Sequence, residues 1–513
     1  MWVVGKGHSA NYLVISFKLR SFVDKLRLCK KEINMKFFCL RAFYGCFLIV
    51  FLSCDTEPLL SDTGIKKKMN VLFIAADDMN TDLGCYGVSQ VKTPNIDRLA
   101  SAGVRFDRAY CQQALCGPSR ASIMTGLRPN TTGFFNNRDD IRKLKPDVVT
   151  LGEFYQKQGY YSARVGKIYH YNNPSGIGTN GSDDAQTWNE RFNPVGIDKT
   201  QEDNITRYAP KKGNLGISMA WWDPETKDEE HTDGMVATKV IELIEKHKDK
   251  PFFIAAGFFN PHCPYVAPKK YFDMYSIDDI EMQDLKKAKE DLGDVPPMAV
   301  SRDMKRWPYY FDDITHEQAR QCKLAYYATI SFVDAQVGRL IEALKRNDLM
   351  DNTLIVFWSD HGYFLGEKGL WYKRKNFERS ARAPMIIAGP GVSKENQACF
   401  QTVELLDLYP TLVDLTGYEI PKNLDGVSLR PLLENPKTRW DKPAITQVYL
   451  KENAQGYSIR TQRWRYTEWN NGEAGTELYD HDNDPGEVIN LAKKARYAET
   501  VKKLSEDLKI YKN

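Results

Sequence analysis

The chain has 513 residues, of which 42% are hydrophobic and 27% are charged. Such a length exceeds one small core, and the composition excludes the disordered and fibrous classes. The formal net charge of +4 is misleading, because residues 1–53 carry nine Lys/Arg against Asp24 and Glu32, which leaves the remainder at −3. A mildly acidic body gives no reason to expect nucleic-acid binding.

The first 53 residues are interpreted as a leader. Residues 42–52 are apolar and follow the basic residues Lys36 and Arg41. A signal-peptide core spans about 7 to 15 residues, whereas a membrane-spanning helix needs about 20. Because Met35 opens a conventional leader by itself, we expect it to be the true start.

The end of the apolar run resembles a bacterial lipoprotein cleavage box. Phe-Leu-Ser precedes Cys54, which would become a lipidated first residue, although Phe51 matches the usual leucine poorly. Plain secretion is the alternative. We expect an exported protein, either periplasmic or attached to the outer membrane of a bacterium. Residues 54–68 would form a tether, and a lipid on Cys54 would be the only membrane contact.

Residues 69–439 alternate between helices and buried strands. We predict strands over 70–76, 160–165, 251–259 and 353–358, and a strand and turn over 384–391, whereas residues 104–110 lead into a cysteine motif. Predicted helices begin at Thr93 and cover 150–158, 233–247, 317–346 and 402–417. This alternation indicates an α/β fold with a large, mainly parallel sheet flanked by helices, whose ligands bind at the carboxyl ends of the strands.

The remaining segments form long excursions and a C-terminal subdomain. Residues 172–224 and 274–310 lack a sustained hydrophobic period and are predicted to be surface loops. Packing within the first loop is a better explanation of Trp221 and Trp222 than a sugar platform. Residues 440–513 are predicted to form a small antiparallel sheet with one helix, from strands at 444–449, 456–460, 464–468 and 477–480 and a helix at 496–511.

Polar side chains occur where several predicted strands end: Asp77, Asp78, Lys167, His262, Asp360 and His361. The three aspartates are hard oxygen ligands of the kind that Ca²⁺ and Mg²⁺ prefer, and His361 is a less typical partner. An Asp pair alone is more often a cap or a turn. The coincidence of several strand ends favours a cation site instead.

Cys116 begins the stretch Cys-Gly-Pro-Ser-Arg. Pro118 is expected to keep Gly117 out of the helical region, so that the thiol lies on a turn and a helix continues over 121–124. Helix amides and Arg120 would favour an anion there. By itself, a single cysteine is more often a small buried residue. Among the ten cysteines, the spacings predict neither a zinc site nor a disulfide framework.

The motif Cys116-x-Pro-Ser-Arg120, followed by Thr125-Gly126, resembles the signature of the type I sulfatases. In that family a separate maturation enzyme oxidises the cysteine to formylglycine. Similarity runs from Asn70 to about Ala492, and the segments that most resemble the iduronate-2-sulfatases are 360–367, 371–378 and 456–460. Met124 and Leu127 depart from the usual Leu and Arg and bear only on maturation.

This resemblance implies an alkaline-phosphatase-like sulfatase fold and a sulfuric ester hydrolase that acts on sulfated glycans. The expected substrate is a 2-O-sulfated uronate of glycosaminoglycan type. The implied cofactors are formylglycine at residue 116 and one divalent cation, Ca²⁺ in preference to Mg²⁺. The implied metal ligands are Asp77, Asp78, Asp360, His361 and the modified Cys116.

The resemblance also implies catalytic roles. Hydrated formylglycine at position 116 attacks sulfur, with Arg120 fixing the diol. Lys167 and Lys373 neutralise the sulfate oxygens. His262 protonates the leaving sugar oxygen and His170 accepts a proton from the second hydroxyl, although the two roles could be exchanged.

Three alternatives remain at this stage. The enzyme could act on another sulfated carbohydrate, because the loops 172–224 and 274–310 and the segment 371–378 would set specificity. It could hydrolyse phosphate or phosphonate esters, although such relatives commonly use Thr or Ser and two metals. It could be an inactive glycan-binding relative, although such a chain is expected to lack one of the catalytic residues.

Overall fold

The computed structural model describes residues 67–208, 214–300, 314–393, 397–450 and 455–512. Lys66–Asn513 forms one compact unit. The predicted leader and Cys54 lie outside the described residues. None of the described helices is long and apolar enough to cross a membrane.

An eight-stranded sheet carries the fold, in the order β13-β2-β12-β9-β1-β7-β3-β4. Central β1 runs parallel to both β7 and β9, whereas β12 runs antiparallel to β9 and β2. The predicted mixed, mainly parallel sheet is confirmed. Its strands are β1 (Asn70–Ala76), β2 (Gly103–Tyr110), β3 (Tyr161–Gly166), β4 (Glu190–Phe192), β7 (Phe252–Gly257), β9 (Thr353–Ser359), β12 (Arg382–Ala388) and β13 (Gln397–Glu404).

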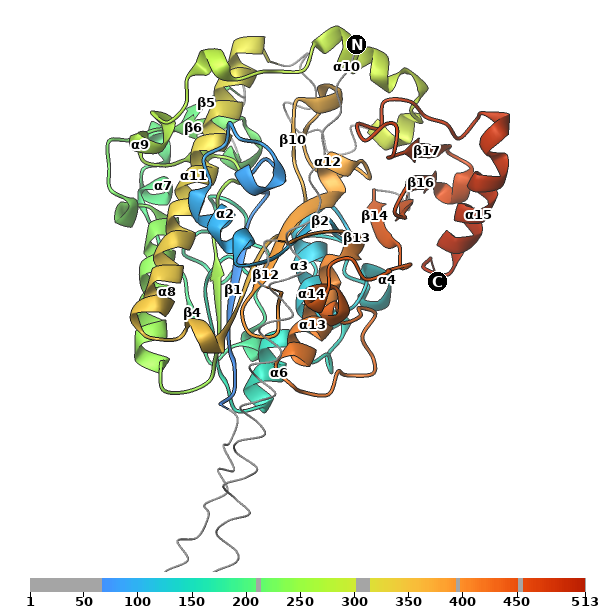
Figure 1. The fold of residues 1–513 in the computed structure, drawn as a ribbon. Helices are drawn as coiled ribbons and strands as arrows, with labels where there is room; N and C mark the ends of the chain where they lie inside the picture. The colour runs from blue at the N-terminus through green and yellow to red at the C-terminus, as the bar shows by residue number, and fades with distance from the viewer. Residues whose placement is uncertain (1–66, 209–213, 301–313, 394–396, 451–454, 513) are drawn as a thin grey trace, which may run out of the picture. The chain divides into compact units, whose positions relative to one another are not determined.

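Helices cover both faces of this sheet (Figure 1). Side chains of β1 alternate: Leu72 and Ile74 pack in one core, Val71 and Phe73 in the other. A strand that is buried on both faces reads as a continuous apolar run, which is why β1 could be predicted. The first core contains α2 (Pro94–Ser101), α8 (Thr232–His247) and α11 (His316–Arg346), and the second contains α3 (Cys116–Thr125), α6 (Leu151–Lys157) and α13 (Leu408–Leu415).

The helix predicted over 402–417 was wrong at its start. Residues 397–404 form β13, which pairs in parallel with β2, and α13 begins only at Leu408. Thr402 and Val403 are β-branched and suit the pleated edge of the sheet, whereas Phe400 of the same strand is 57% exposed. Exposed Phe400 interrupts the hydrophobic alternation expected of a strand. The helical pattern that belongs to α13 was therefore extended back to residue 402.

The predicted C-terminal sheet is present, in the order β14-β15-β16-β17, and all its pairings are antiparallel. Leu504 and Leu508 of the last helix pack against it. β14 is also joined to the segment that follows β2, because Gln447 N–H donates to the carbonyl oxygen of Gln112 at 2.8 Å. The bounds are β14 (Ala444–Tyr449), β15 (Gln455–Arg460), β16 (Trp464–Trp469), β17 (Thr476–Asp480) and α15 (Ala498–Lys509). The boundary at residue 440 stays a prediction.

The excursions contain short elements rather than uninterrupted loops. In the first excursion, Trp221 packs against Phe272 with ring centroids 6.0 Å apart and donates to Tyr208 Oη, in keeping with the predicted packing role. The short elements of the chain are β5 (Thr206–Arg207), β6 (Ala220–Trp222), β8 (Tyr265–Val266), β10 (Phe364–Leu365), β11 (Trp371–Tyr372), α4 (Pro129–Thr132), α5 (Ile141–Leu144), α7 (Ile197–Thr200), α9 (Lys269–Phe272), α10 (Leu285–Asp291), α12 (Glu378–Ala381) and α14 (Arg430–Glu434).

Candidate active site

Three adjacent parallel strands deliver acidic and histidine side chains to one edge of the sheet. Asp77 and Asp78 follow β1, His262 follows β7, and Asp360 and His361 follow β9. Because parallel strands end at the same edge, these side chains meet there as predicted. All except His262, which is slightly exposed, are fully buried or nearly so.

The backbone turns sharply as it leaves β1. Asp78 has a φ of 63°, a left-handed conformation that is uncommon outside glycine. The turn is held from two elements, because Asp78 N–H donates to Asp360 Oδ1 at 3.1 Å and Tyr326 Oη donates to the Asp78 carbonyl at 2.8 Å. Strained backbone of this kind persists only where surrounding contacts determine it.

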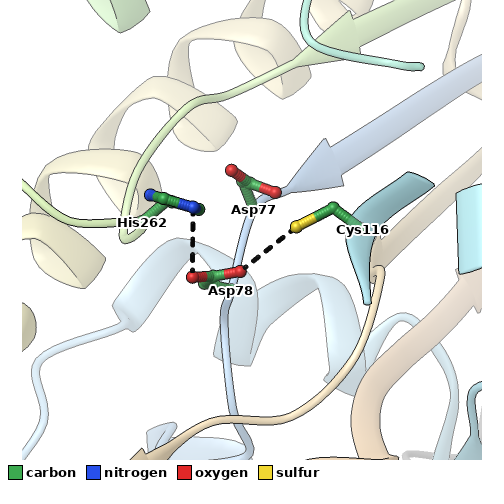
Figure 2. A group of neighbouring side chains, drawn as sticks. All are labelled: Asp77, Asp78, Cys116 and His262. Atoms are coloured by element: carbon green, nitrogen blue, oxygen red, sulfur yellow. Dashed lines mark hydrogen bonds and ion pairs between the residues drawn. The ribbon is translucent and has the colours of Figure 1, made fainter. Parts of the chain in front are cut away.

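Helix α3 begins at Cys116, five residues earlier than the predicted helical stretch. Gly117 and Pro118 lie in its first turn, where a missing N–H costs nothing, so the proline does not displace the helix start. Gly117 N–H donates instead to Asn137 Oδ1 at 2.8 Å. The thiol therefore occupies the first helical position, and its sulfur lies 3.7 Å from Asp78 Oδ1 (Figure 2).

Arg120 holds the carboxylates of two strands together. Its Nε is 2.8 Å from Asp360 Oδ2 and its Nη2 is 3.0 Å from Asp77 Oδ1. Its Nη1 also donates to the Lys167 carbonyl at 2.8 Å. Arg120 is completely buried, and these contacts make it an orienting clamp for the acidic residues beneath Cys116.

Two lysines pair with the acidic residues. Lys167 Nζ contacts Asp77 Oδ2, and Lys373 Nζ contacts Asp78 Oδ1. Lys373 Nζ is also 3.2 Å from Cys116 Sγ, so its positive charge lies beside the sulfur. Its neighbours Tyr372 and Arg374 have φ values of 71° and 72°, which marks the segment as strained on both sides of the lysine.

His262 and His361 both point Nε2 toward the acidic residues. His262 Nδ1–H donates to the Cys263 carbonyl at 2.6 Å, and its Nε2 is 3.6 Å from Asp78 Oδ2 (Figure 2). His361 Nδ1–H donates to the Gly362 carbonyl at 2.9 Å, and its Nε2 is 3.4 Å from both Asp78 Oδ1 and Cys116 Sγ. A backbone bond at Nδ1 fixes the tautomer that leaves Nε2 available as a ligand or proton carrier.

His170 comes shortly after β3, at the same edge of the sheet, and it lines a cavity. Its side chain is buried, yet neither ring nitrogen has a hydrogen-bond partner within the described parts of the chain. Burial lowers the pKa of His170 well below its ordinary value, and Lys167 adds to this effect. Burial and the positive charge of Lys373 likewise lower the pKa of His262 well below its ordinary value.

The donor set fits a divalent cation. Ligand atoms of Asp78, Cys116, Asp360 and His361 all lie within 4.8 Å of one another, and a second such group joins Asp77, Asp78, Cys116 and His262. Asp78 Oδ2 is buried and accepts no hydrogen bond from the described residues. Burial raises the pKa of Asp78 in spite of Lys373, because desolvation disfavours the ionised carboxylate.

The surroundings of Cys116 disfavour ionisation of its thiol. Burial raises the pKa of the Cys116 thiol well above its ordinary value. Lys373 lowers it, whereas the charges of Asp77, Asp360 and Asp78 raise it further.

Some supporting residues escaped the sequence prediction. Asp233, at the start of α8, accepts from Phe259 N–H at 2.8 Å and from Asn260 N–H at 2.9 Å, and so positions the turn before His262. Its place in a helical first turn was a usable signal. Tyr326 carries no such signal, because it lies in the middle of the long helix α11.

Comparison with known proteins places the chain in a family. The family model described as Sulfatase matches residues 69–418, and the model described as N-sulphoglucosamine sulphohydrolase, C-terminal, matches residues 366–513. The chain belongs to the type I sulfatase family. It is therefore a sulfuric ester hydrolase by family, and the predicted family and fold class are confirmed.

Several curated relatives are similar to this sulfatase over most of its length. A sulfatase of Formosa agariphila is 35% identical and covers 89% of both chains. Iduronate 2-sulfatase of Homo sapiens is 30% identical and covers 82% of this chain and 91% of its own. Choline-sulfatase of Rhizobium meliloti is 31% identical, covering 84% and 83% respectively. Comparable identity to different sulfatases leaves the substrate open.

Two solved structures share the fold of this sulfatase. One is a protein in complex with its substrate D-glucosamine-2-N,6-O-disulfate, with 26% identity, a TM-score of 0.66 and coverage of 87% of this chain and 97% of its own. The other is the phosphonate monoester hydrolase of Agrobacterium radiobacter, with 26% identity, a TM-score of 0.70 and coverage of 86% and 95%.

Proposed function

We propose that this sulfatase removes sulfate from sulfated glycans and prefers a 2-O-sulfated uronate of glycosaminoglycan type. The observation that carries the proposal is Cys116 at the first position of α3, 3.2 Å from Lys373 Nζ and among the ligand atoms of a candidate cation site. Similarity to human iduronate 2-sulfatase over most of both chains supports the choice of substrate.

We further propose that residue 116 works as formylglycine, with Ca²⁺ held by Asp77, Asp78, Asp360 and His361. When bound, the cation would polarise a sulfate oxygen and lower the pKa of the attacking group. The oxidised residue 116 would supply the attacking oxygen. The match of Cys116-x-Pro-Ser-Arg120 to the family signature, within the part of the chain that the Sulfatase model covers, supports this modification.

The remaining residues have roles that follow from their positions. Arg120 keeps Asp77 and Asp360 in place, and Lys373 and Lys167 bring positive charge to the sulfate oxygens. His262 would first take up a proton at Nε2 and then pass it to the leaving sugar oxygen, because its Nδ1–H is engaged with a backbone carbonyl. His170, whose ring nitrogens have no described partner, accepts the proton at residue 116.

A mass measurement tests the nucleophile. Conversion of the thiol to the aldehyde loses hydrogen sulfide and gains oxygen, a decrease of about 18 Da in the peptide that contains residue 116. Peptide mass spectrometry of protein from a host with the maturation enzyme should find this decrease. An unmodified cysteine in fully active protein would contradict the proposal.

A substrate panel tests specificity. Sulfate release should be fastest from a 2-O-sulfated uronate among defined sugars sulfated at other positions and choline sulfate. Faster release from another sulfated sugar would retain the enzyme class and reject the uronate.

Phosphonate ester hydrolysis is a second candidate, favoured by the similarity to the phosphonate monoester hydrolase structure. Phenylphosphonate monoesters in the same panel decide between the two. Turnover of the phosphonate above that of every sulfate ester would reverse the assignment.

We also propose export of the chain and lipid attachment at Cys54. The basic residues before the apolar run 42–52 and the Ser-Cys that follows it support this. Expression in a bacterium with Cys54→Ser should move the protein from the membrane fraction to the soluble periplasmic fraction. An unchanged distribution would reject lipid attachment.

A further inference from the structure

A large cavity is lined in part by His170, and the reaction described above gives no role to the other residues of its lining. Its volume is about 920 Å³. Ligand pockets in proteins range from about 300 to 1,000 Å³, so this one has room for more than a single sugar ring. Its lining includes Asn137, Arg138, His170, Glu202, Arg207 and Leu215.

The cavity is joined to the reaction centre at three places. His170 belongs to both. Asn137 lines the cavity and accepts the hydrogen bond from Gly117 N–H, directly after the nucleophile position. The Leu215 carbonyl, which also belongs to a lining residue, accepts from Cys263 Sγ at 3.2 Å, next to His262. A ligand in the cavity would therefore extend from the sulfate that is hydrolysed.

The charges in the cavity favour an anion. Arg138 and Arg207 contribute two guanidinium groups to the lining. The acidic lining residue, Glu202, is already paired with Lys199. A guanidinium presents two parallel donors that match a carboxylate or a sulfate, whereas a lysine presents a point charge.

The uncharged part of the lining suits hydroxyl groups. Six side chains are short amides or alcohols, and the apolar contribution comes from Pro174 and Leu215. Such groups donate to and accept from sugar hydroxyls, whereas an aryl group would find little apolar surface. Both the size and the chemistry of the cavity therefore point to an anionic carbohydrate.

We propose that this cavity binds a second ring of an anionic oligosaccharide and that Arg138 and Arg207 recognise a carboxylate or a sulfate on the substrate. The proposal rests on the proposed glycan sulfatase function and deepens it. It makes the enzyme selective for an oligosaccharide with an anionic group besides the sulfate that is removed.

The test compares three variants of the matured full-length enzyme. Arg138→Gln and Arg207→Gln each remove one guanidinium. Lys143→Gln is the matched control, because Lys143 follows on the same stretch, carries the same charge, and has a side chain that is 84% exposed. Arg138 is itself exposed, so its variant is expected to fold, and circular dichroism checks this for all three.

The substrates are a disaccharide of 2-O-sulfated uronate and N-sulfated glucosamine, and 4-nitrophenyl sulfate. The readout is the ratio of kcat/KM for the disaccharide to kcat/KM for the aryl sulfate. We expect each arginine variant to lower this ratio by about ten-fold or more, mainly through KM, because each loses a charge-assisted hydrogen bond. Lys143→Gln should keep the wild-type ratio.

Two modified disaccharides identify the anion. If the Arg138→Gln effect disappears when the uronate carboxyl is reduced to an alcohol, the arginine binds the carboxylate. If it disappears when the N-sulfate is replaced by N-acetyl, the arginine binds the sulfate. Either result supports the proposal.

Opposite results separate two failures. This inference alone would be overturned if the wild-type enzyme cleaves the disaccharide and both arginine variants keep the wild-type ratio of the two kcat/KM values. Wild-type enzyme that cleaves the aryl sulfate but no sulfated sugar would overturn the proposed function and this inference together.

Discussion

Among the described residues, two clusters bring metal-ligand side chains together, but only one of them leaves a carboxylate oxygen without a hydrogen-bond partner. In the active site, Asp78, Cys116, Asp360 and His361 come within 4.8 Å of one another, and so do Glu378, His481 and Glu487 near the C-terminal sheet. Both clusters also contain buried arginine. Acidic and histidine residues at suitable distances therefore do not by themselves make a cation site.

The difference lies in which oxygens already have partners. In the C-terminal cluster, Arg465 contacts both Glu378 and Glu487 at 2.5 Å, Tyr110 donates to Glu378, and His481 contacts Glu487 at 3.0 Å. In the active site, Asp78 Oδ2 is buried without a described hydrogen-bond partner. The closed cluster stabilises the fold, whereas the open one can receive a ligand.

The largest effect on activity is expected from Cys116→Ala, a substitution in the open cluster. It removes the proposed nucleophile, so sulfate release should fall by at least about 10³-fold, a loss typical of removing a catalytic nucleophile. The side chain is small, and thermal unfolding should therefore remain near that of the wild type. Retained turnover at one tenth of the wild-type rate would place the nucleophile elsewhere.

The second-largest effect is expected from chelation, which should act on the open cluster and leave the closed one unchanged. Exhaustive treatment with EGTA should reduce activity to about 1% or less and lower the unfolding temperature, because Asp77, Asp78 and Asp360 would lose their counter-charge. Added Ca²⁺ should restore both properties better than Mg²⁺. Full activity in protein shown by metal analysis to be metal-free would exclude a catalytic cation.

A pair of buried lysines sharpens the contrast. Lys373 lies in the open cluster, whereas Lys368 pairs with Asp291 at 3.0 Å and also donates to the Glu487 carbonyl. Lys373→Met should lower kcat by about 10²–10³-fold, as expected from losing charge stabilisation at the reacting group.

Lys368→Met is the matched control for that substitution. It should lower the free energy of unfolding by about 3–5 kcal/mol, because Asp291 is left without its partner, while folded molecules keep their kcat. Activity assays and chemical denaturation measure the two effects. If Lys373→Met and Lys368→Met lose kcat alike and have the same free energy of unfolding, the two clusters do not differ in function.

The smallest effect is expected from the pH dependence of the closed cluster. Burial by itself raises the pKa of Glu378, but His481, Arg460 and Arg465 hold it well below its ordinary value. Its ionised form therefore stabilises the fold above the unfolded-state pKa of about 4.3, and this contribution is lost as the pH falls toward the folded-state value.

Glu378→Gln should accordingly cost about 3 kcal/mol at pH 7, and less as the pH falls below 4. Urea denaturation of both proteins between pH 3.5 and 7 measures this difference. A difference that grows on acidification would show that the sign is wrong.

The sequence predicted the catalytic edge because parallel strands bring distant residues to one place. Asp77, His262 and Asp360 each follow an apolar run that could only be a buried strand. The start of α3 was misplaced because the first turn of a helix accommodates Pro118. Strand β13 was missed because exposed Phe400 interrupts the alternation of an edge strand.

Other parts of the site could not be predicted from local pattern. Lys373 was found only by resemblance, because it follows the two-residue strand β11 and is flanked by left-handed residues. Arg138 comes from a turn and Arg207 from the two-residue strand β5, and both segments are too short to show a hydrophobic period. Their meeting in one cavity is a consequence of tertiary packing alone.

The complete burial of α3 means that a second protein can reach Cys116 only before the chain has folded. Every residue from Cys116 to Thr125 is buried, so no second protein can grip this helix once the chain has folded. If residue 116 is oxidised as proposed, the modification competes with folding, and each molecule that folds first is trapped as an inert thiol. The specific activity of a preparation then reports a race between two rates, and a variant that folds more slowly can emerge more fully active.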